Sequence, residues 1–179
     1  MRFVETVVAG AYVVELEPRE DERGFFARIF CEREFEGLGL ATPMVQANLS
    51  YNVRKGTVRG LHYRREPAPE AKFFRCIAGA THNVCADIRP DSETYGRYAA
   101  VELSAANRRA LYVPGGCAAG YQALTDGAEI IYMTSVFYEP GFEYGVRYDD
   151  PAIGIEWPLA VTDVSERDAT WPLLDVSSE

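Results

Sequence analysis

The chain has 179 residues, a net charge of −9 and 47% hydrophobic residues, which is typical of a globular protein with a substantial core. The acidic balance argues against a general nucleic-acid or anionic-membrane binder, and no run approaches the roughly 18 apolar residues of a membrane span. Four scattered cysteines and an N-terminus without an apolar leader favour a cytoplasmic protein with reduced thiols. We predict one domain over residues 1–179.

Short apolar runs separated by turn residues make up most of the chain. Eleven Tyr and nine Phe favour sheet over helix. A helix is predicted over 32–38, and turns are predicted near 149–154 and 163–170. The number of short runs predicts an antiparallel all-β domain, and glycine turns at 77–80 and 113–116 suit the rim of a double-sheet jelly roll. Strands are predicted, in chain order, at 10–15, 25–30, 57–62, 73–77, 82–88, 98–103, 110–113, 120–124, 129–134 and 145–147.

Metal and cofactor motifs are missing from the sequence. His62 and His82 are the only histidines, and they do not form the multi-histidine shell that zinc or non-haem iron would need. Neither a P-loop nor a G-x-G-x-x-G dinucleotide motif is present. We therefore expect a protein without a metal or a cofactor.

His62 is the strongest candidate for acid–base chemistry, although a lone histidine in a half-buried strand is more often a hydrogen-bonded filler. Arg59 and Lys72 lie among strand-forming residues near it, and their charges would suit a pyrophosphate or an oxyanion. A pocket with His, Lys, Tyr and a carboxylate suits removal of a proton next to a carbonyl group.

Several motifs occur in an order that resembles the dTDP-4-dehydrorhamnose 3,5-epimerase family, metal-independent cupin-fold enzymes of deoxysugar biosynthesis. The resemblance covers nearly the whole chain, and its R-G-L-H and D-D-P-x-x-x-I-x-W-P elements are highly specific. The matching motifs are Asp21-x-Arg23-Gly24-x-Phe26, Gln46-x-Asn48-x-Ser50, Arg59-Gly60-Leu61-His62-Tyr63, Val84-x-x-Asp87-Ile88-Arg89, Ser92-x-Thr94-x-Gly96, Leu103-Ser104-x-x-Asn107-Arg108, Pro114-x-Gly116, Asp149-Asp150-Pro151, Ile155-x-Trp157-Pro158 and Ser165-x-x-Asp168.

The resemblance implies a cupin-type double-sheet jelly roll with a few short helices, and it implies catalytic roles. His62 would be the base and Asp168 its partner, Tyr132 the acid on the other face of the sugar, and Lys72 the group that stabilises the enolate. It also implies a homodimer that exchanges N-terminal strands. The substrate contacts that it implies are Arg23, Phe26, Gln46, Asn48, Arg59 and Tyr138.

Three positions depart from the family pattern, and each is a predicted substrate contact. Ala119 stands where the family usually has a histidine, and Asn83 replaces a family aspartate. Arg28 stands where an acidic residue is expected to help recognise thymine. We therefore expect an intact proton-transfer centre with altered substrate contacts, and the nucleotide could be dTDP, GDP, CDP or UDP.

The leading hypothesis is an epimerase that inverts C3, C5 or both in a nucleotide-linked 4-keto-6-deoxy sugar. One alternative is a keto-isomerase that moves the carbonyl group of a similar substrate with the same base. The other is a non-catalytic cupin that binds sugar nucleotides, which the changes at Ala119 and Asn83 favour. The joint presence of His62, Lys72, Tyr132 and Asp168 argues against that second alternative.

Overall fold

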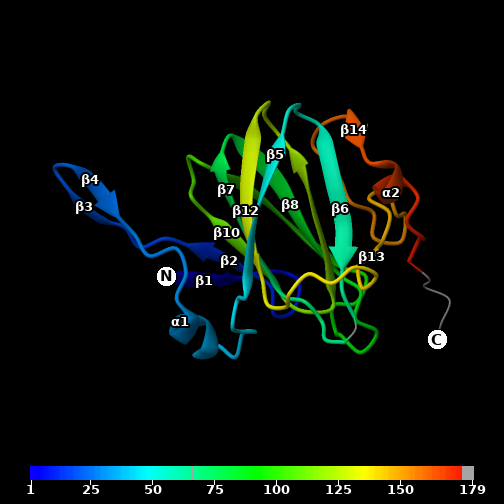
Figure 1. The fold of residues 1–179 in the computed structure, drawn as a ribbon, viewed down its shortest axis with the longest axis horizontal. Coiled ribbons are helices and arrows are strands. Elements are labelled where there is room, and N and C mark those ends of the chain that lie inside the picture. The colour runs from blue at the N-terminus through cyan, green and yellow to red at the C-terminus, as the bar shows by residue number, and fades with distance from the viewer. Residues whose placement is uncertain (66, 175–179) are drawn as a thin grey trace.

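The computed structural model describes residues 1–65 and 67–174 and consists mainly of two β-sheets, which confirms the predicted all-β class (Figure 1). The strands of the first sheet are, in spatial order, β1 (Arg2–Glu5), β2 (Tyr12–Glu15), β10 (Ala110–Val113), β7 (Lys72–Ala78), β12 (Ala128–Thr134) and β5 (Gln46–Asn52). Those of the second are β13 (Tyr144–Gly145), β6 (Thr57–Tyr63), β11 (Cys117–Ala123), β8 (Ala80–Asp87) and β9 (Tyr98–Ser104), with β14 (Asp163–Val164) parallel to β6.

The main core lies between the two sheets. Phe74 and Ile130 project into it from the first sheet, and Cys85 and Leu103 project from the second. Side chains alternate along β7, so that Phe74 faces this core and Phe73 faces the opposite side of the sheet. The same alternation turns residues near the strand ends toward the space between the sheets, where a cavity can form.

Two further hydrophobic clusters cover the outer faces of the sheets. Helix α1 (Glu32–Glu36) packs its buried Phe35 against Phe73 and Tyr112 on the first sheet, with edge-on ring contacts. Residues 146–157 cover the second sheet, where Ile153 and Trp157 pack with buried residues of β6, β8 and β11. Side chains packed on the outer face of each sheet therefore hold its strands, and the side chains of its inner face, in position.

A two-stranded hairpin, β3 (Arg19–Asp21) and β4 (Gly24–Phe26), projects away from both sheets (Figure 1). A strand is predicted over 25–30, but β4 ends at Phe26, because the chain turns to pack Phe30 against Phe35. Strands β1, β3 and β5 were not predicted. The region predicted as a turn near 163–170 contains β14 and helix α2 (Glu166–Ala169).

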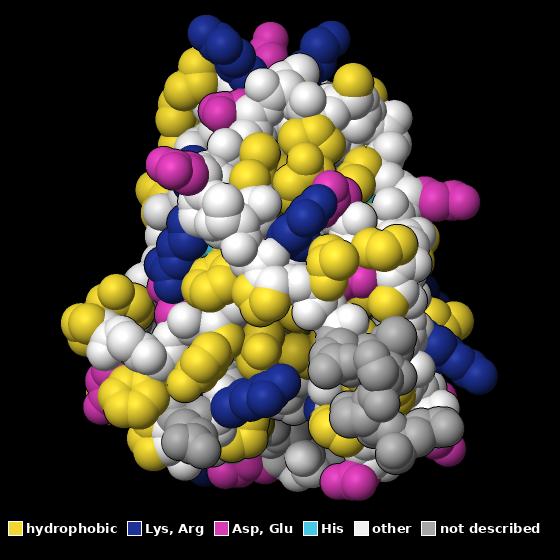
Figure 2. All heavy atoms as spheres, turned by 90° about the vertical axis from the view of Figure 1, so that its right-hand side faces the viewer, with side chains coloured by type: hydrophobic (Ala, Val, Ile, Leu, Met, Phe, Trp, Pro, Cys, Tyr) yellow, Lys and Arg dark blue, Asp and Glu magenta, His cyan; other side chains and the backbone are white. Residues whose placement is uncertain are grey.

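Charged side chains are mixed on the face that carries β6 and α2. Figure 2 shows basic and acidic groups interspersed among hydrophobic ones on this face, without a broad patch of one sign. Neither helix in the described part of the chain is long and apolar enough to cross a bilayer.

Candidate active site

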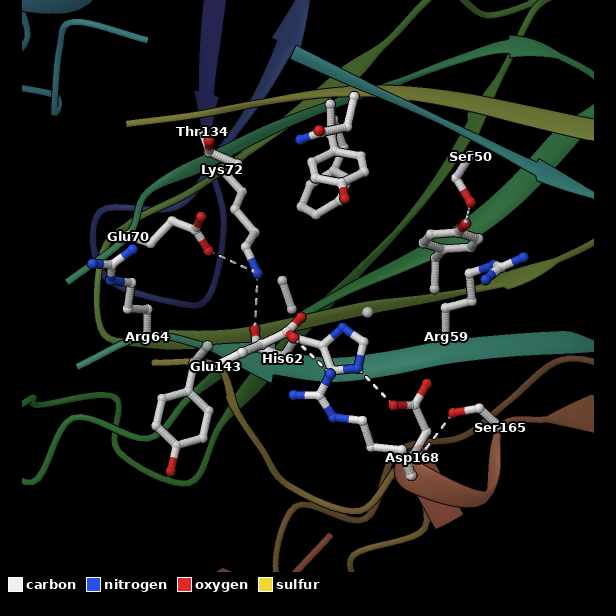
Figure 3. A pocket seen from close by; sticks show the side chains of 18 of the residues that line it. Ser50, Arg59, His62, Arg64, Glu70, Lys72, Thr134, Glu143, Ser165 and Asp168 are labelled. Atoms are coloured by element: carbon white, nitrogen blue, oxygen red, sulfur yellow. Dashed lines mark hydrogen bonds and ion pairs between the residues drawn. The ribbon is translucent and has the colours of Figure 1, made fainter. Parts of the chain in front are cut away.

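A cavity of about 450 Å³ lies between the sheets, and its walls come from both of them. Strands β5, β7 and β12 supply one wall, β6 and β11 supply the other, and the segments around 138–143 and 163–168 complete it. Figure 3 shows His62, Lys72, Glu70 and Asp168 gathered around this space.

His62 and Asp168 form a hydrogen-bonded pair in the wall of the cavity. The Nε2 atom of His62 lies 2.6 Å from Oδ1 of Asp168, and the two side chains are 26% and 6% exposed. Burial by itself raises the pKa of Asp168, but the hydrogen bond from His62 and further donors outweigh burial, so this pKa lies below its ordinary value. The ionised carboxylate can only accept, so Nε2 carries the hydrogen of this bond and Nδ1 points toward the cavity (Figure 3).

Local structure fixes Asp168 in place. Ser165 caps the N-terminus of α2, and its hydroxyl oxygen accepts a hydrogen bond from the Asp168 backbone N–H at 3.0 Å. The Gly60 N–H donates to Oδ2 of Asp168 at 3.1 Å. Asp168 lies in a region that was predicted as a turn, and in the structure its carboxylate is buried and has a fixed direction.

Gly60 is required by the close approach of β6 and β11. Its φ is +120°, and a Cβ at this position would lie 2.7 Å from the Cα of Gly120 and 2.8 Å from the carbonyl oxygen of Ala119. The absence of a side chain lets β11 pair with β6 so that Ala119 lies directly opposite His62. This explains the glycine of the R-G-L-H motif.

Lys72 lies at the start of β7 and shares the cavity with a carboxylate that the sequence did not reveal. Its Nζ is 3.1 Å from Oε2 of Glu70 and donates to the backbone oxygen of His62 at 3.3 Å. The side chains of Lys72 and Glu70 are only 12% and 15% exposed. The lysine is therefore held next to the histidine by an ion pair that is largely shielded from water.

Tyr132 projects from β12, in the sheet that faces His62. Its ring packs against Phe74, with the centroids 5.4 Å apart. Burial raises the pKa of the Tyr132 phenol, and the neighbouring Tyr121 and Glu70 add to the rise. The phenol therefore keeps its proton at neutral pH and is available as an acid.

Other predicted substrate contacts line the same cavity. Arg59 donates from Nε to Oδ1 of Asn52 at 2.9 Å, which directs its guanidinium group. Gln46 donates to Asn48 at 3.0 Å and accepts from the backbone N–H of Tyr138 at 3.0 Å. The described chain thus brings nine of the predicted site residues together: His62, Asp168, Lys72, Tyr132, Arg59, Gln46, Asn48, Ala119 and Tyr138.

Four predicted contacts lie outside this cavity. Arg23 and Phe26 belong to the projecting β3–β4 hairpin, where Arg23 pairs with Asp21 and the Phe26 side chain is 72% exposed. Arg28 pairs with Glu34 beside α1. Asn83 is buried on β8, one strand farther from β6 than Tyr121, and its side chain donates to Thr81 at 2.8 Å. Within one chain, none of these four side chains reaches the cavity.

Several residues with polar or aromatic side chains contribute to the site but were not expected from the sequence. The alternation of β7 indicates Glu70, because it lies two residues before Lys72 and so extends the inward-facing series. Ser50 likewise continues the series of Gln46 and Asn48 on β5. No comparable signal marks the others, which come from loops, from α2 or from the other sheet. The additional residues are Glu70, Ser50, Tyr121, Glu143, Ser165, Arg167 and Trp171.

Two facing sheets define a cupin-type jelly roll, and the cavity between them is lined by a His–Asp pair, a partly buried tyrosine and a shielded lysine, groups that suit acid–base chemistry. The family model described as dTDP-4-dehydrorhamnose 3,5-epimerase matches residues 5–175. The chain therefore belongs to the dTDP-4-dehydrorhamnose 3,5-epimerase family and is an isomerase.

Individual relatives agree with this assignment. A dTDP-4-dehydrorhamnose 3,5-epimerase of Methanothermobacter thermautotrophicus is 42% identical over 95% of this chain and 92% of its own length. The crystal structure of the enzyme of that name from Elizabethkingia anophelis is 35% identical, with a TM-score of 0.94 over 100% of this chain and 99% of that one. A 3′-monoepimerase from Streptomyces bikiniensis, in complex with dTDP-quinovose, is 32% identical, with a TM-score of 0.85 over 93% and 85% of the two chains.

Proposed function

We propose that the protein inverts C3, C5 or both in a nucleotide-linked 4-keto-6-deoxy sugar by removing and returning a proton beside the ketone. The observation that carries this proposal is that His62 of one sheet, paired with Asp168 of α2, faces a protonated Tyr132 of the other sheet. An inversion needs a base and an acid on opposite sides of the reacting carbon, and the two sheets supply them.

The first step transfers a proton from carbon to nitrogen. Nδ1 of His62 takes the proton, and the electron pair of the broken C–H bond forms the enolate. Asp168 stabilises the imidazolium that results, through the hydrogen bond to Nε2. Lys72 donates to the enolate oxygen, for which its position beside the His62 backbone is well suited.

The second step rebuilds the C–H bond from the other side. Tyr132 donates its phenolic proton to the carbon, and the configuration inverts. The phenolate and the imidazolium return to their starting states by exchange with solvent. The proposed nucleotide end of the substrate contacts Arg59, Gln46 and Asn48, which line the cavity beside these groups.

The carbon that reacts depends on how the sugar lies against His62. Ala119 is directly opposite His62 and offers neither a hydrogen bond nor a charge to hold a second pose. Relatives include enzymes named for both positions and enzymes named for a single position. Inversion at one carbon is therefore as consistent with this cavity as inversion at two.

We also propose that the protein acts as a homodimer that exchanges its N-terminal hairpins. Arg23, Phe26 and Arg28 are absent from their own cavity, and Phe25 and Phe26 are exposed on a projecting hairpin. The outer face of β5 extends this exposed apolar surface with Leu49 and Tyr51.

We expect one domain over 1–179 that works in the cytoplasm, in keeping with the free thiols of all four cysteines.

Incubation with 4-keto sugar nucleotides in heavy water tests the proposed reaction. We expect deuterium at C3, at C5 or at both, read by NMR, with the configuration inverted there. A panel of dTDP, GDP, CDP and UDP sugars identifies the nucleotide. His62→Asn should reduce incorporation at least about 100-fold, because it removes the base.

His82→Asn is the matched control, because His82 is the only other histidine and lies outside the cavity. It should keep the incorporation of the unchanged protein. Movement of the carbonyl group from C4 to C3 would replace the epimerase with the keto-isomerase. Binding of the panel without incorporation would leave only a sugar-nucleotide-binding protein.

A further inference from the structure

Trp171 contacts the catalytic pair from outside the cavity. Its indole Nε1 donates to Oδ1 of Asp168 at 3.3 Å, the same oxygen that accepts from His62 at 2.6 Å. The ring of Trp171 also lies edge-on to that of His62, with the centroids 6.5 Å apart. Trp171 does not line the cavity, so it cannot act on a substrate directly.

We infer that Trp171 is a positioning residue, which fixes the direction of the Asp168 carboxylate and thereby the orientation of His62. A carboxylate rotates easily about its last torsion, so one hydrogen bond leaves its second oxygen and its tilt unfixed. Here Trp171 and Gly60 donate to different oxygens of Asp168. This inference rests on the proposed role of His62 as the base.

The indole itself is held in place by two neighbours. A Cβ at position 145 would lie 2.3 to 2.5 Å from Nε1, Cε2 and Cδ1 of Trp171, so only glycine leaves room for the ring. The guanidinium carbon of Arg167 lies 4.8 Å from the indole centroid, and Arg167 pairs with Glu143 at 2.6 Å. Gly145 and Arg167 therefore fix the position of the indole N–H donor.

The hydrogen bond has an electrostatic consequence that can be measured without a substrate. The indole N–H donates to the charged form of Asp168 and contributes to the lowering of its pKa. Loss of this donor should therefore raise the pKa of Asp168. The other charged or titratable groups that line the cavity around the pair are Arg59, Tyr63, Arg64, Glu70, Lys72, Tyr121, Tyr132, Tyr138, Glu139, Glu143, Asp163 and Arg167.

Trp171→Phe keeps an aromatic ring and removes the N–H together with the second ring of the indole. We expect kcat to fall about tenfold with KM unchanged, the effect of losing one hydrogen bond to a charged group. We also expect a higher pKa of Asp168 by carboxyl 13C NMR of the protein alone. Gly145→Ala, which keeps the indole but displaces it, should give the same two changes and serves if Trp171→Phe does not fold.

Trp157→Phe is the matched control, because the indole N–H of Trp157 donates to the backbone oxygen of Tyr148 at 2.9 Å, on the outer face of the sheet. It should leave the pKa of Asp168 and kcat unchanged. An unchanged pKa in Trp171→Phe, or an equal rise in Trp157→Phe, would overturn the inference. A raised pKa in a protein with no epimerase activity would refute the proposed function and leave the positioning role standing.

Discussion

His62 and His82 lie in the same sheet, on β6 and β8, but differ in the partners of their Nε2 atoms. Nε2 of His62 is bonded to Asp168, whereas Nε2 of His82 is buried and has no hydrogen-bond partner in the described part of the chain. A distant carboxylate, 106 residues farther along the chain, thus makes one histidine suitable as a base. At the scale of single residues, chemistry depends on such partners more than on residue type.

Glu70 provides a prediction at this scale. Glu70→Gln should keep Lys72 in position, because the amide oxygen can still accept its hydrogen bond, and should remove a negative charge that competes with an anionic substrate for Lys72. We expect KM for the sugar nucleotide to fall about threefold, which is less than roughly 1 kcal/mol in binding, with kcat within about a factor of two. Steady-state kinetics at two salt concentrations measures both constants.

Glu143→Gln removes the same charge from the cavity wall but affects Arg167 instead of Lys72. It should change KM less than Glu70→Gln does. A rise in KM for Glu70→Gln would show that the carboxylate positions Lys72 rather than competing for it.

The sequence predicted the central residues because their chemistry and their motifs agree. Lys72, Tyr132 and Asp168 could be joined to His62 through the resemblance to a family, whereas their spacing in the chain gave no distances. Glu70 and Trp171 were not predicted because their roles come from contacts across the fold: an ion pair inside the cavity and a hydrogen bond behind it. The alternation of β7 places Glu70 on the side of Lys72, but neither contact can be read from the spacing of residues in a single sequence.

At the scale of elements, β5 shows why one strand escaped prediction. Its polar residues Gln46, Asn48 and Ser50 face the cavity, whereas Leu49 and Tyr51 face outward and are more than half exposed. The alternation is that of a strand, but its polarity is reversed relative to a strand that buries its apolar side. Strands 73–77 and 129–134 were predicted well because Phe74 and Ile130 point into the main core, and 57–62 because Leu61 is buried in the cluster behind its sheet.

His82, on the outer face of β8, allows us to predict how the free energy of unfolding depends on pH. Burial lowers the pKa of His82, and the carboxylate of Glu102, its cross-strand neighbour, partly opposes this. The unfolded chain therefore binds the proton more readily than the folded one, so stability is highest above the unfolded pKa of about 6.5 and falls as the pH drops below it. Urea unfolding between pH 8 and pH 5 measures this decline.

His82→Gln should flatten the decline, and Glu102→Gln should steepen it, because the two changes act on the same titration with opposite sign. The lowered pKa of Asp168 affects stability only at more acidic pH, where its carboxylate becomes protonated. An unchanged slope in His82→Gln would show that another group controls stability in this range.

At the scale of the whole molecule, the proposed exchange of the β3–β4 hairpin would divide the site between two chains. Figure 1 shows it projecting from the side of the sandwich opposite β6 and α2. His62 and Arg23 can therefore contribute to one reaction only if they come from different subunits. A measurement of activity can therefore test how the subunits assemble.

Subunit mixing tests this arrangement. His62→Asn and Arg23→Ala should each be nearly inactive alone. After unfolding and refolding together, half of the dimers contain one chain of each kind, and each of these has one complete site, so activity should recover to about a quarter of the unchanged protein. Recovery should be absent when either variant is refolded with itself, and no recovery in the mixture would contradict the exchange of hairpins.

His62 and Tyr132 lie on different sheets. This placement separates the entry of solvent hydrogen into the sugar from the inversion of its configuration, which a single catalytic group could not separate. Without the phenol, the base can still remove a proton and return a solvent one from its own side, so label would enter the sugar while its handedness stays the same. Without the imidazole, neither event occurs. The distance between two sheets, set by the packing of the core, is thus what converts hydrogen exchange into a change of stereochemistry.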